Sequence, residues 1–281
     1  MKIKIAIQGE LGSYSHLAAK EIFENVDVVP CKTFDQALEL VKNNKNINTV
    51  IPIENSIAGR VADVHYLLPK YKLSIIGEFF HQINHCLLTK KGNDLKKIKY
   101  VKSHSHAIGQ CHKKINEYNL SPIIEADTAG AAKKLSEEQN SDVAVIASEL
   151  AAEIYNLDII EKNFEDISGN TTRFLIMSSQ ELDLKNFEKN KKYITTCIFK
   201  LKSLPAALYN SLGGFASNNV NLTKLESFTV NNSFDQALFY LDIEGHLKEA
   251  KVNAALDELK KNTESLDILG VYLASEYRNS H

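Results

Sequence analysis

Two threonines and an arginine that follow a polar turn have the clearest potential for chemistry. Residues 168–170 are Ser-Gly-Asn, which is typical of a tight turn, and residues 174–177 are the apolar run Phe-Leu-Ile-Met. Thr171, Thr172 and Arg173 lie between them. A hydroxyl can donate a hydrogen bond or a proton, and a guanidinium can hold a carboxylate bidentately. The pattern indicates a site for an anionic substrate; a surface turn with an arginine ion pair is the alternative interpretation.

Other polar residues stand where predicted strands end. Glu54, Asn55 and Ser56 follow the short apolar run 49–53, and Ser103 follows a strand at 100–102. Ligands of α/β sheets bind beyond the carboxyl ends of strands, so these side chains are candidates for one site. Gln110 comes seven residues after Ser103, and the two would share a helix face if the helix began by then.

A glycine-containing turn connects the first predicted strand to a helix. Residues 12–16 are Gly-Ser-Tyr-Ser-His. The first amides of a helix have no partner within it, so such a turn can receive an anion. Two glycines of the dinucleotide fingerprint are absent, so a nucleotide site is not indicated. A helix cap without a ligand is the alternative.

Histidines occur in two groups that could suggest a metal site. His81 and His85 are four residues apart, but their apolar neighbours favour strands over one helix face. Residues 104–112 contain three histidines and Cys111, with spacings that match no zinc signature. We therefore expect no metal, and we interpret the histidines as solvated or adjacent to a ligand. The roles of His104 and His106 stay open.

The pattern of elements predicts two domains. Strands and helices alternate in the first part, with a helix at 56–68 that Pro69 ends, which indicates a largely parallel α/β sheet. The polar segment 179–192 has the composition of a linker. After it we expect a ferredoxin-like βαββαβ order. Its elements are a strand at 193–199, a helix from Pro205, strands at 220–230 and 236–243, a helix at 247–261 and a strand at 266–273. The predicted boundaries are 1–178, 179–192 and 193–281.

The composition excludes several classes of partner. The chain has 281 residues, 44% of them hydrophobic, and a net charge of −2 at pH 7, which suits two globular domains. It lacks a dense basic run, so we expect neither nucleic acid nor membrane as a partner. The four cysteines show no C-x-x-C spacing, and residues 1–3 lead directly into a strand. We expect reduced thiols, no cleavable signal and a cytoplasmic location.

Taken together, these segments resemble prephenate dehydratase followed by a regulatory ACT domain, over essentially the whole chain. The matching motifs are residues 12–16, 52–59, 103–104 with Gln110, 128–132, 170–174 and 221–227. The resemblance implies an α/β fold with a two-lobed, periplasmic-binding-protein-like catalytic domain and a ferredoxin-like ACT domain. It also implies loss of carbon dioxide and water from prephenate to give phenylpyruvate, in phenylalanine biosynthesis, without metal or organic cofactor.

The resemblance also implies roles for the candidate residues. Thr172 would hydrogen-bond to or protonate the departing ring hydroxyl, and Arg173 with nearby amides would bind a carboxylate. A carboxylate that must leave as neutral carbon dioxide should not be paired with cations, so neutral donors suit it better. The catalytic candidates are Thr172, Asn55, Ser103, Gln110 and Glu54, the last suited to orienting neighbours. The substrate-binding candidates are Arg173, Ser13, Tyr14, Ser15, Ser56, Thr171 and Phe174.

Some segments depart from the family pattern. Residues 105–106 are Ser-His instead of Pro-Gln, and Asp127 stands where Ser is frequent. Residues 205–208 are Pro-Ala-Ala-Leu instead of a Gly-Ala-Leu pattern, and residues 226–229 are Glu-Ser-Phe-Thr instead of Glu-Ser-Arg-Pro. The family binds phenylalanine with these last two segments, between ACT domains of a dimer. We therefore expect a homo-oligomer, dimer or tetramer, in which phenylalanine inhibits weakly or not at all. The effector-binding candidates are Ala206, Ala207, Leu208, Asn221, Leu222, Glu226 and Ser227.

Two other functions stay open at this point. An arogenate dehydratase performs the same ring chemistry, and one neutral contact to the side chain can decide between the two substrates. A non-catalytic protein that binds a small anion would share the two-lobed fold. The pair Thr172-Arg173 argues against this second alternative.

Overall fold

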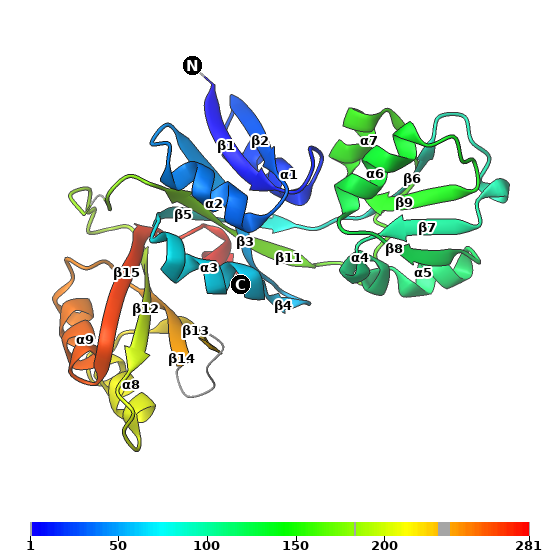
Figure 1. The fold of residues 1–281 in the computed structure, drawn as a ribbon. Coiled ribbons are helices and arrows are strands. Elements are labelled where there is room, and N and C mark those ends of the chain that lie inside the picture. The colour runs from blue at the N-terminus through cyan, green and yellow to red at the C-terminus, as the bar shows by residue number, and fades with distance from the viewer. Residues whose placement is uncertain (1, 183, 230–236, 281) are drawn as a thin grey trace. The chain divides into compact units, whose positions relative to one another are not determined.

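The computed structural model describes residues 2–182, 184–229 and 237–280 (Figure 1). The chain forms two compact units. The first comprises the residues up to Ala37, Val50–Arg60 and Phe80–Phe174; the second comprises Leu38–Thr49, Val61–Phe79 and the residues from Leu175 onwards. Three strands have residues in both units: β3 (Ile47–Asn55), β5 (Ser74–Gln82) and β11 (Thr171–Ser178). Each unit is therefore built from segments that are distant in sequence.

The first unit begins with a parallel strand-helix-strand arrangement. Its elements are β1 (Ile3–Gln8), α1 (Tyr14–Ile22) and β2 (Val26–Cys31). Helix α2 (Phe34–Lys42) follows, with residues in both units. β1 and β2 are parallel. Ile5, Ala6 and Ile7 are fully buried, so β1 is a core strand. The strand order here is β11-β3-β1-β2, and the short β4 (Gly59–Arg60) pairs with the end of β3.

A five-stranded sheet in the same unit has helices on both faces (Figure 1). Along its central strand β9, Val143, Val145 and Ala147 face one apolar core, and Ala144 and Ile146 face another. This double burial explains why β9 is apolar at every position. Strands β7, β8 and β9 are parallel, whereas β6 is antiparallel to β9 and β10, so the sheet is mixed. In the order β10-β6-β9-β7-β8 the strands are Leu157–Lys162, Cys86–Lys90, Val143–Ala147, Tyr100–Ser103 and Ser121–Ile124. The helices are α4 (Ser105–Gln110), α5 (His112–Glu117), α6 (Thr128–Glu137) and α7 (Glu149–Tyr155), with a short 3-10 turn at Leu95–Lys97.

In the second unit, the elements after the polar segment follow the βαββαβ order that the sequence predicts. They are β12 (Tyr193–Leu201), α8 (Ala207–Ser217), β13 (Leu222–Thr229), β14 (Ala237–Glu244), α9 (Ala250–Lys261) and β15 (Thr263–Leu273). The strand order is β13-β14-β12-β15-β5. At the β15–β5 contact, a Cβ on Gly270 would stand 2.5 Å from the carbonyl oxygen of Ile75, so only glycine fits. Val230 and Gln236, which the sequence places in strands, lie outside the described residues.

The predicted helix at 56–68 is wrong in its start and its end. Asn55 Oδ1 accepts hydrogen bonds from the amides of Ile57 and Ala58, at 3.0 and 2.8 Å, so these residues form a turn. Helix α3 (Ala62–Tyr71) begins only after β4 and contains Pro69 in its last turn. Among the described residues, we find no helix with the length and apolar character needed to cross a bilayer.

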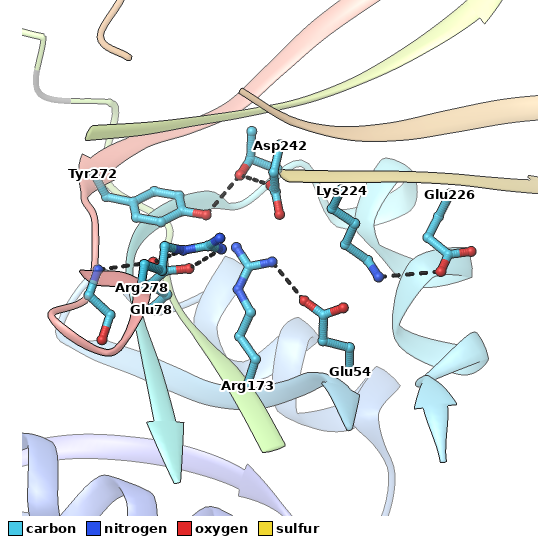
Figure 2. A network of polar contacts seen from close by, with 10 residues as sticks. Glu54, Glu78, Arg173, Lys224, Glu226, Asp242, Tyr272 and Arg278 are labelled. Carbon is cyan, nitrogen blue, oxygen red and sulfur yellow. Dashed lines mark hydrogen bonds and ion pairs between the residues drawn. The ribbon is translucent and has the colours of Figure 1, made fainter. Parts of the chain in front are cut away.

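The C-terminal helix α10 (Tyr277–Ser280) is tied to β5 by a buried carboxylate (Figure 2). The side chain of Glu78 is fully buried and accepts hydrogen bonds from Arg278 Nε at 2.7 Å and Nη2 at 2.9 Å. The backbone amide of Ser275 donates to the same carboxylate at 3.0 Å. Such bidentate pairs are strong and fix geometry.

We predict that Arg278→Ala lowers the free energy of unfolding by roughly 3 kcal/mol, because a buried carboxylate loses its guanidinium. Lys191→Ala is the control: Lys191 and Glu188 form an ion pair in the same unit, with side chains 50% and 63% exposed. Its loss should change stability by less than about 0.5 kcal/mol. Denaturant unfolding measures both variants. Equal, small effects would contradict a stabilising role for the Glu78–Arg278 pair.

Candidate active site

The start of β11 is held rigidly. Gly169 has a φ of +91°, a left-handed conformation that favours glycine. Ser56 Oγ accepts a hydrogen bond from the Thr171 amide at 2.9 Å, and the Ser56 amide donates to the Thr171 carbonyl at 2.8 Å. Thr171 and Thr172 are both buried. Thr172 is therefore presented by a stiff element, as the sequence predicts.

Thr172 is hydrogen-bonded to Asn55, and the direction of this bond can be deduced. Asn55 Nδ2 lies 2.9 Å from Thr172 Oγ1 and 2.6 Å from Asn170 Oδ1. The amides of Ile57 and Ala58 can only donate, so the oxygen of the Asn55 side chain faces them and its nitrogen faces Thr172. The hydroxyl oxygen of Thr172 therefore accepts, and its own proton is left to donate.

The same reasoning extends the network to Tyr14. Asn170 Nδ2 donates to Gln110 Oε1 at 2.9 Å, and His85 Nε2 lies 2.9 Å from that oxygen. An amide oxygen only accepts, so in a neutral imidazole Nε2 carries the proton. His85 Nδ1 then accepts from the hydroxyl of Tyr14, 2.6 Å away. We call the six connected residues, Tyr14, His85, Gln110, Asn170, Asn55 and Thr172, the amide network.

The amide network leaves two unused donors. Gln110 Oε1 receives two hydrogen bonds, which leaves the amide nitrogen of Gln110 without a role in the network. Within the part of the chain that the structure describes, neither this nitrogen nor the hydroxyl proton of Thr172 has an acceptor. Both donors are neutral groups, a side-chain amide and a hydroxyl.

Burial sets the charge state of the network. Desolvation raises the pKa of Tyr14 well above its ordinary value of 10.0, and nearby Cys86, Cys111 and Glu165 add to the effect. Desolvation lowers the pKa of His85 below 6.5, although its hydrogen bond to Gln110 and the charge of Glu165 oppose this. Both rings are therefore neutral at pH 7.

Arg173 points to the opposite face of β11 from Thr172, because side chains alternate along a strand. Its side chain is 1% exposed, and Nη1 donates to Glu54 Oε1 at 2.9 Å (Figure 2). It also lies over the ring of Phe80, 5.9 Å from the centroid. This geometry makes Glu54 an orienting partner, and binding of a substrate carboxylate by Arg173 stays a prediction.

Ser103 is separate from the amide network. It is the last residue of β7, fully buried, and its hydroxyl donates to the carbonyl of Ile146 at 2.6 Å. Helix α4 begins at Ser105, so the prediction that Ser103 and Gln110 share a helix face is wrong. Phe174 is likewise buried in the core. Catalysis by Ser103 and substrate contact by Phe174 stay predictions.

The candidate residues in and after the turn before α1 have different roles. Ser13 Oγ caps the helix by accepting from the His16 amide at 3.4 Å, and Ser15 is buried. Tyr14 joins the amide network. Gly12, with a φ of +86°, packs so closely on Ala151 that a Cβ would stand 2.8 Å from its Cα.

The sequence does not assign His85 or Asn170 to the site. Asn170 carries a visible signal, since it belongs to the polar turn before Thr172, whereas His85 shows only as a polar residue among apolar ones. Two of the other histidines have partners outside the amide network. His81 lies 3.0 Å from Glu21, and His104 caps α4 by accepting from the His106 amide at 3.3 Å.

The predicted effector segment lines an open surface pocket of about 480 Å³ in the second unit. The end of β12, the connection that follows and the first turn of α8 form it, from Leu201 to Tyr209, and Ala206 there has a φ of +60°. The other effector candidates lie on or beside β13. They are Asn221, whose carbonyl accepts from the Glu244 amide at 2.9 Å, Leu222, Ser227, and Glu226, which pairs with Lys224 at 3.3 Å (Figure 2).

Comparisons with known proteins agree along the chain. Residues 5–182 match the family model for prephenate dehydratase. A bifunctional N-acyl-homoserine lactone acylase/prephenate dehydratase of Komagataeibacter europaeus is 40% identical, over 98% of this chain and 97% of the relative. Arogenate dehydratase/prephenate dehydratase 2 of Arabidopsis thaliana is 34% identical, over 96% of this chain and 73% of the relative. The crystal structure of prephenate dehydratase from Arthrobacter aurescens in complex with L-Phe is 27% identical with a TM-score of 0.87, over 97% of this chain and 90% of that chain.

We predict that turnover is independent of pH between about pH 7 and 9, because His85 and Tyr14 stay neutral throughout this range. Steady-state kinetics on the substrate proposed below measure kcat at each pH. A titration of kcat with a midpoint inside this range would contradict the assigned charge states. Below pH 6.5 the unfolded chain takes up the His85 proton before the folded chain does, so stability should fall as the pH falls.

We predict that Ser103→Ala destabilises the fold by about 1 to 3 kcal/mol, because the buried carbonyl of Ile146 loses its donor. Turnover at saturating substrate should stay within about threefold of the unsubstituted protein, a small change in activation free energy. Denaturant unfolding and kinetics on the same preparation test the two parts. A large fall in kcat with unchanged stability would give Ser103 a catalytic role instead.

Proposed function

We propose that this chain, which belongs to the prephenate dehydratase family of hydro-lyases, converts prephenate to phenylpyruvate and that Thr172 supplies the proton that this reaction needs. One observation carries the proposal: the amide network holds the hydroxyl of Thr172 as an acceptor from Asn55, so that its proton is free for the substrate. Gln110 offers a second neutral donor from its amide nitrogen.

The reaction requires one proton. The bond between the ring and its carboxylate breaks, its electrons enter the ring, and the ring hydroxyl leaves. A dianion and a proton thus give a monoanion, carbon dioxide and water, and Thr172 regains the proton that it donated from solvent water. Aromatisation drives the reaction, so a weak acid in a fixed position is sufficient. The hydrogen bond from Asn55 withdraws electron density from Oγ1 of Thr172 and makes its proton easier to donate.

The placement of charge supports the same mechanism. A cation beside the departing carboxylate would stabilise the substrate more than the transition state. Glu54 neutralises Arg173, and Arg173 lies on the face of β11 opposite Thr172. We propose that neutral donors, not this guanidinium, face the carboxylate that is lost.

We predict that Thr172→Ala lowers kcat at least about a hundredfold and leaves KM nearly unchanged, because only the transition state needs the donated proton. Thr172→Ser is the control, since it keeps a hydroxyl, and it should restore most of the lost turnover. The absorbance of phenylpyruvate measures both variants. An unchanged kcat in Thr172→Ala would remove this residue from the mechanism.

One comparison of rates tests which substrate the protein prefers. We propose prephenate as the preferred substrate, because the relative that is 40% identical bears that name. The Arabidopsis thaliana relative is named for arogenate as well. Turnover on prephenate and arogenate at matched concentrations decides between them, and a higher kcat/KM on arogenate would overturn the preference.

We also propose a division into a catalytic domain at 1–178, a linker at 179–192 and a regulatory ACT domain at 193–281 that pairs in a homo-oligomer. The βαββαβ order of β12 to β15 supports it. The Arthrobacter aurescens relative was crystallised with L-Phe, which supports phenylalanine as the effector class. Residues 201–209, which include Ala206, Ala207 and Leu208, would contribute to the effector site.

We predict that phenylalanine shows no saturable binding below about 1 mM, because Ala206 and Phe228 replace the glycine and arginine of the family motifs. Ala206 adopts a φ of +60°, a conformation that glycine adopts more readily. Titration calorimetry with the full chain measures the binding, and Ala206→Gly is the matched variant that should strengthen it. Tight, stoichiometric binding to the unsubstituted protein would contradict the prediction.

A second activity is suggested by the name of a relative. The Komagataeibacter europaeus protein is also named an N-acyl-homoserine lactone acylase, and the similarity covers 97% of it. We propose the same hydrolysis for this chain, in which water cleaves the amide into a fatty acid and homoserine lactone. Release of the primary amine from an N-acyl-homoserine lactone tests it, and a rate equal to that without protein would exclude it.

A further inference from the structure

Tyr14 stands at the opposite end of the amide network from Thr172, joined to it through His85, Gln110, Asn170 and Asn55. Its hydroxyl is 2.6 Å from His85 Nδ1 and 3.0 Å from the carbonyl oxygen of Asn84, and the two rings meet edge to face with centroids 5.6 Å apart. It therefore has two acceptors for one proton. Donation to His85 has a consequence that donation to Asn84 lacks, because His85 continues the network.

A neutral imidazole carries its single proton on one nitrogen or the other. With the proton on Nε2, His85 donates to Gln110 Oε1, as the distance of 2.9 Å allows. With the proton on Nδ1, the bare Nε2 would face that amide oxygen, and two acceptors would be in contact. Gln110 would then have to turn its amide over, lose the hydrogen bond from Asn170, and direct its oxygen outwards.

We propose that Tyr14 is a positioning residue for the reaction: by donating to His85 Nδ1 it keeps the His85 proton on Nε2, and it thereby keeps the amide nitrogen of Gln110 directed to the substrate. The proposal deepens the proposed function, on which it rests. A turned amide would present an oxygen to a dianion, and the resulting repulsion would slow the reaction.

The backbone of His85 is fixed independently of Tyr14. Glu165 accepts a hydrogen bond from the His85 amide at 2.7 Å, and the His85 carbonyl accepts from the Phe164 amide at 2.8 Å. Loss of the Tyr14 hydroxyl should therefore leave the His85 ring in place. It should remove only the constraint on which ring nitrogen carries the proton. This separates a positioning role from a general structural one.

The test uses Tyr14→Phe in the full chain, with Tyr155→Phe as the matched control. Tyr155 also loses a hydroxyl that donates at 2.8 Å, here to the carbonyl of Leu11, outside the amide network. We expect Tyr14→Phe to lower kcat about tenfold, an effect of one lost orienting contact, and Tyr155→Phe to keep kcat within about twofold. Equal kcat values for the two variants would overturn the proposal.

The nitrogen-15 NMR spectrum of histidine-labelled protein provides a second readout without substrate. In the unsubstituted protein, His85 should show a protonated Nε2 and a bare Nδ1, and in Tyr14→Phe the two resonances should move toward each other as the tautomers mix. A protonated Nδ1 in the unsubstituted protein would overturn the proposal even if Tyr14→Phe did not fold. Absence of turnover on prephenate would refute the proposed function, while the tautomer measurement would still decide the claim about His85.

Discussion

The backbone amides of Ile57 and Ala58 donate to the side-chain oxygen of Asn55, at 3.0 and 2.8 Å. Because these groups can only donate, they determine which end of the Asn55 amide meets Thr172. The direction of each further hydrogen bond in the amide network follows from the orientation of the Asn55 amide. The chemistry proposed for Thr172 depends on that direction, since a hydroxyl that already donated to Asn55 would have no proton for the substrate.

The fold supports this constraint with elements that are distant in sequence. β3 ends at Asn55, and the turn that follows provides both donors. β11 begins at Thr171, and Ser56 ties its first residue to the same turn. Gln110 ends α4, and His85 precedes β6. With α1, which begins at Tyr14, five separate segments thus contribute neutral polar groups, and burial keeps the tyrosine and histidine among them uncharged.

Several of these features could be predicted from sequence, because they depend on local patterns. Three of them follow from the spacing of apolar and turn residues: the turn before Thr172, the position of Asn55 at the end of a strand, and the βαββαβ order. Features that depend on contact with a residue distant in sequence could not be predicted. Nothing near Ser103 in the sequence shows that Ile146 accepts its hydroxyl, and nothing near His85 shows that Gln110 lies beside it.

The central claim is the direction of the bond between Asn55 and Thr172, and Asn55→Asp tests it most directly. The new carboxylate is nearly the same shape as the amide but can only accept, so it would take the proton of Thr172. The account predicts that Asn55→Asp lowers kcat about as much as Thr172→Ala, and that the double variant is no slower than either. Near-normal turnover in Asn55→Asp, or losses that multiply in the double variant, would contradict it.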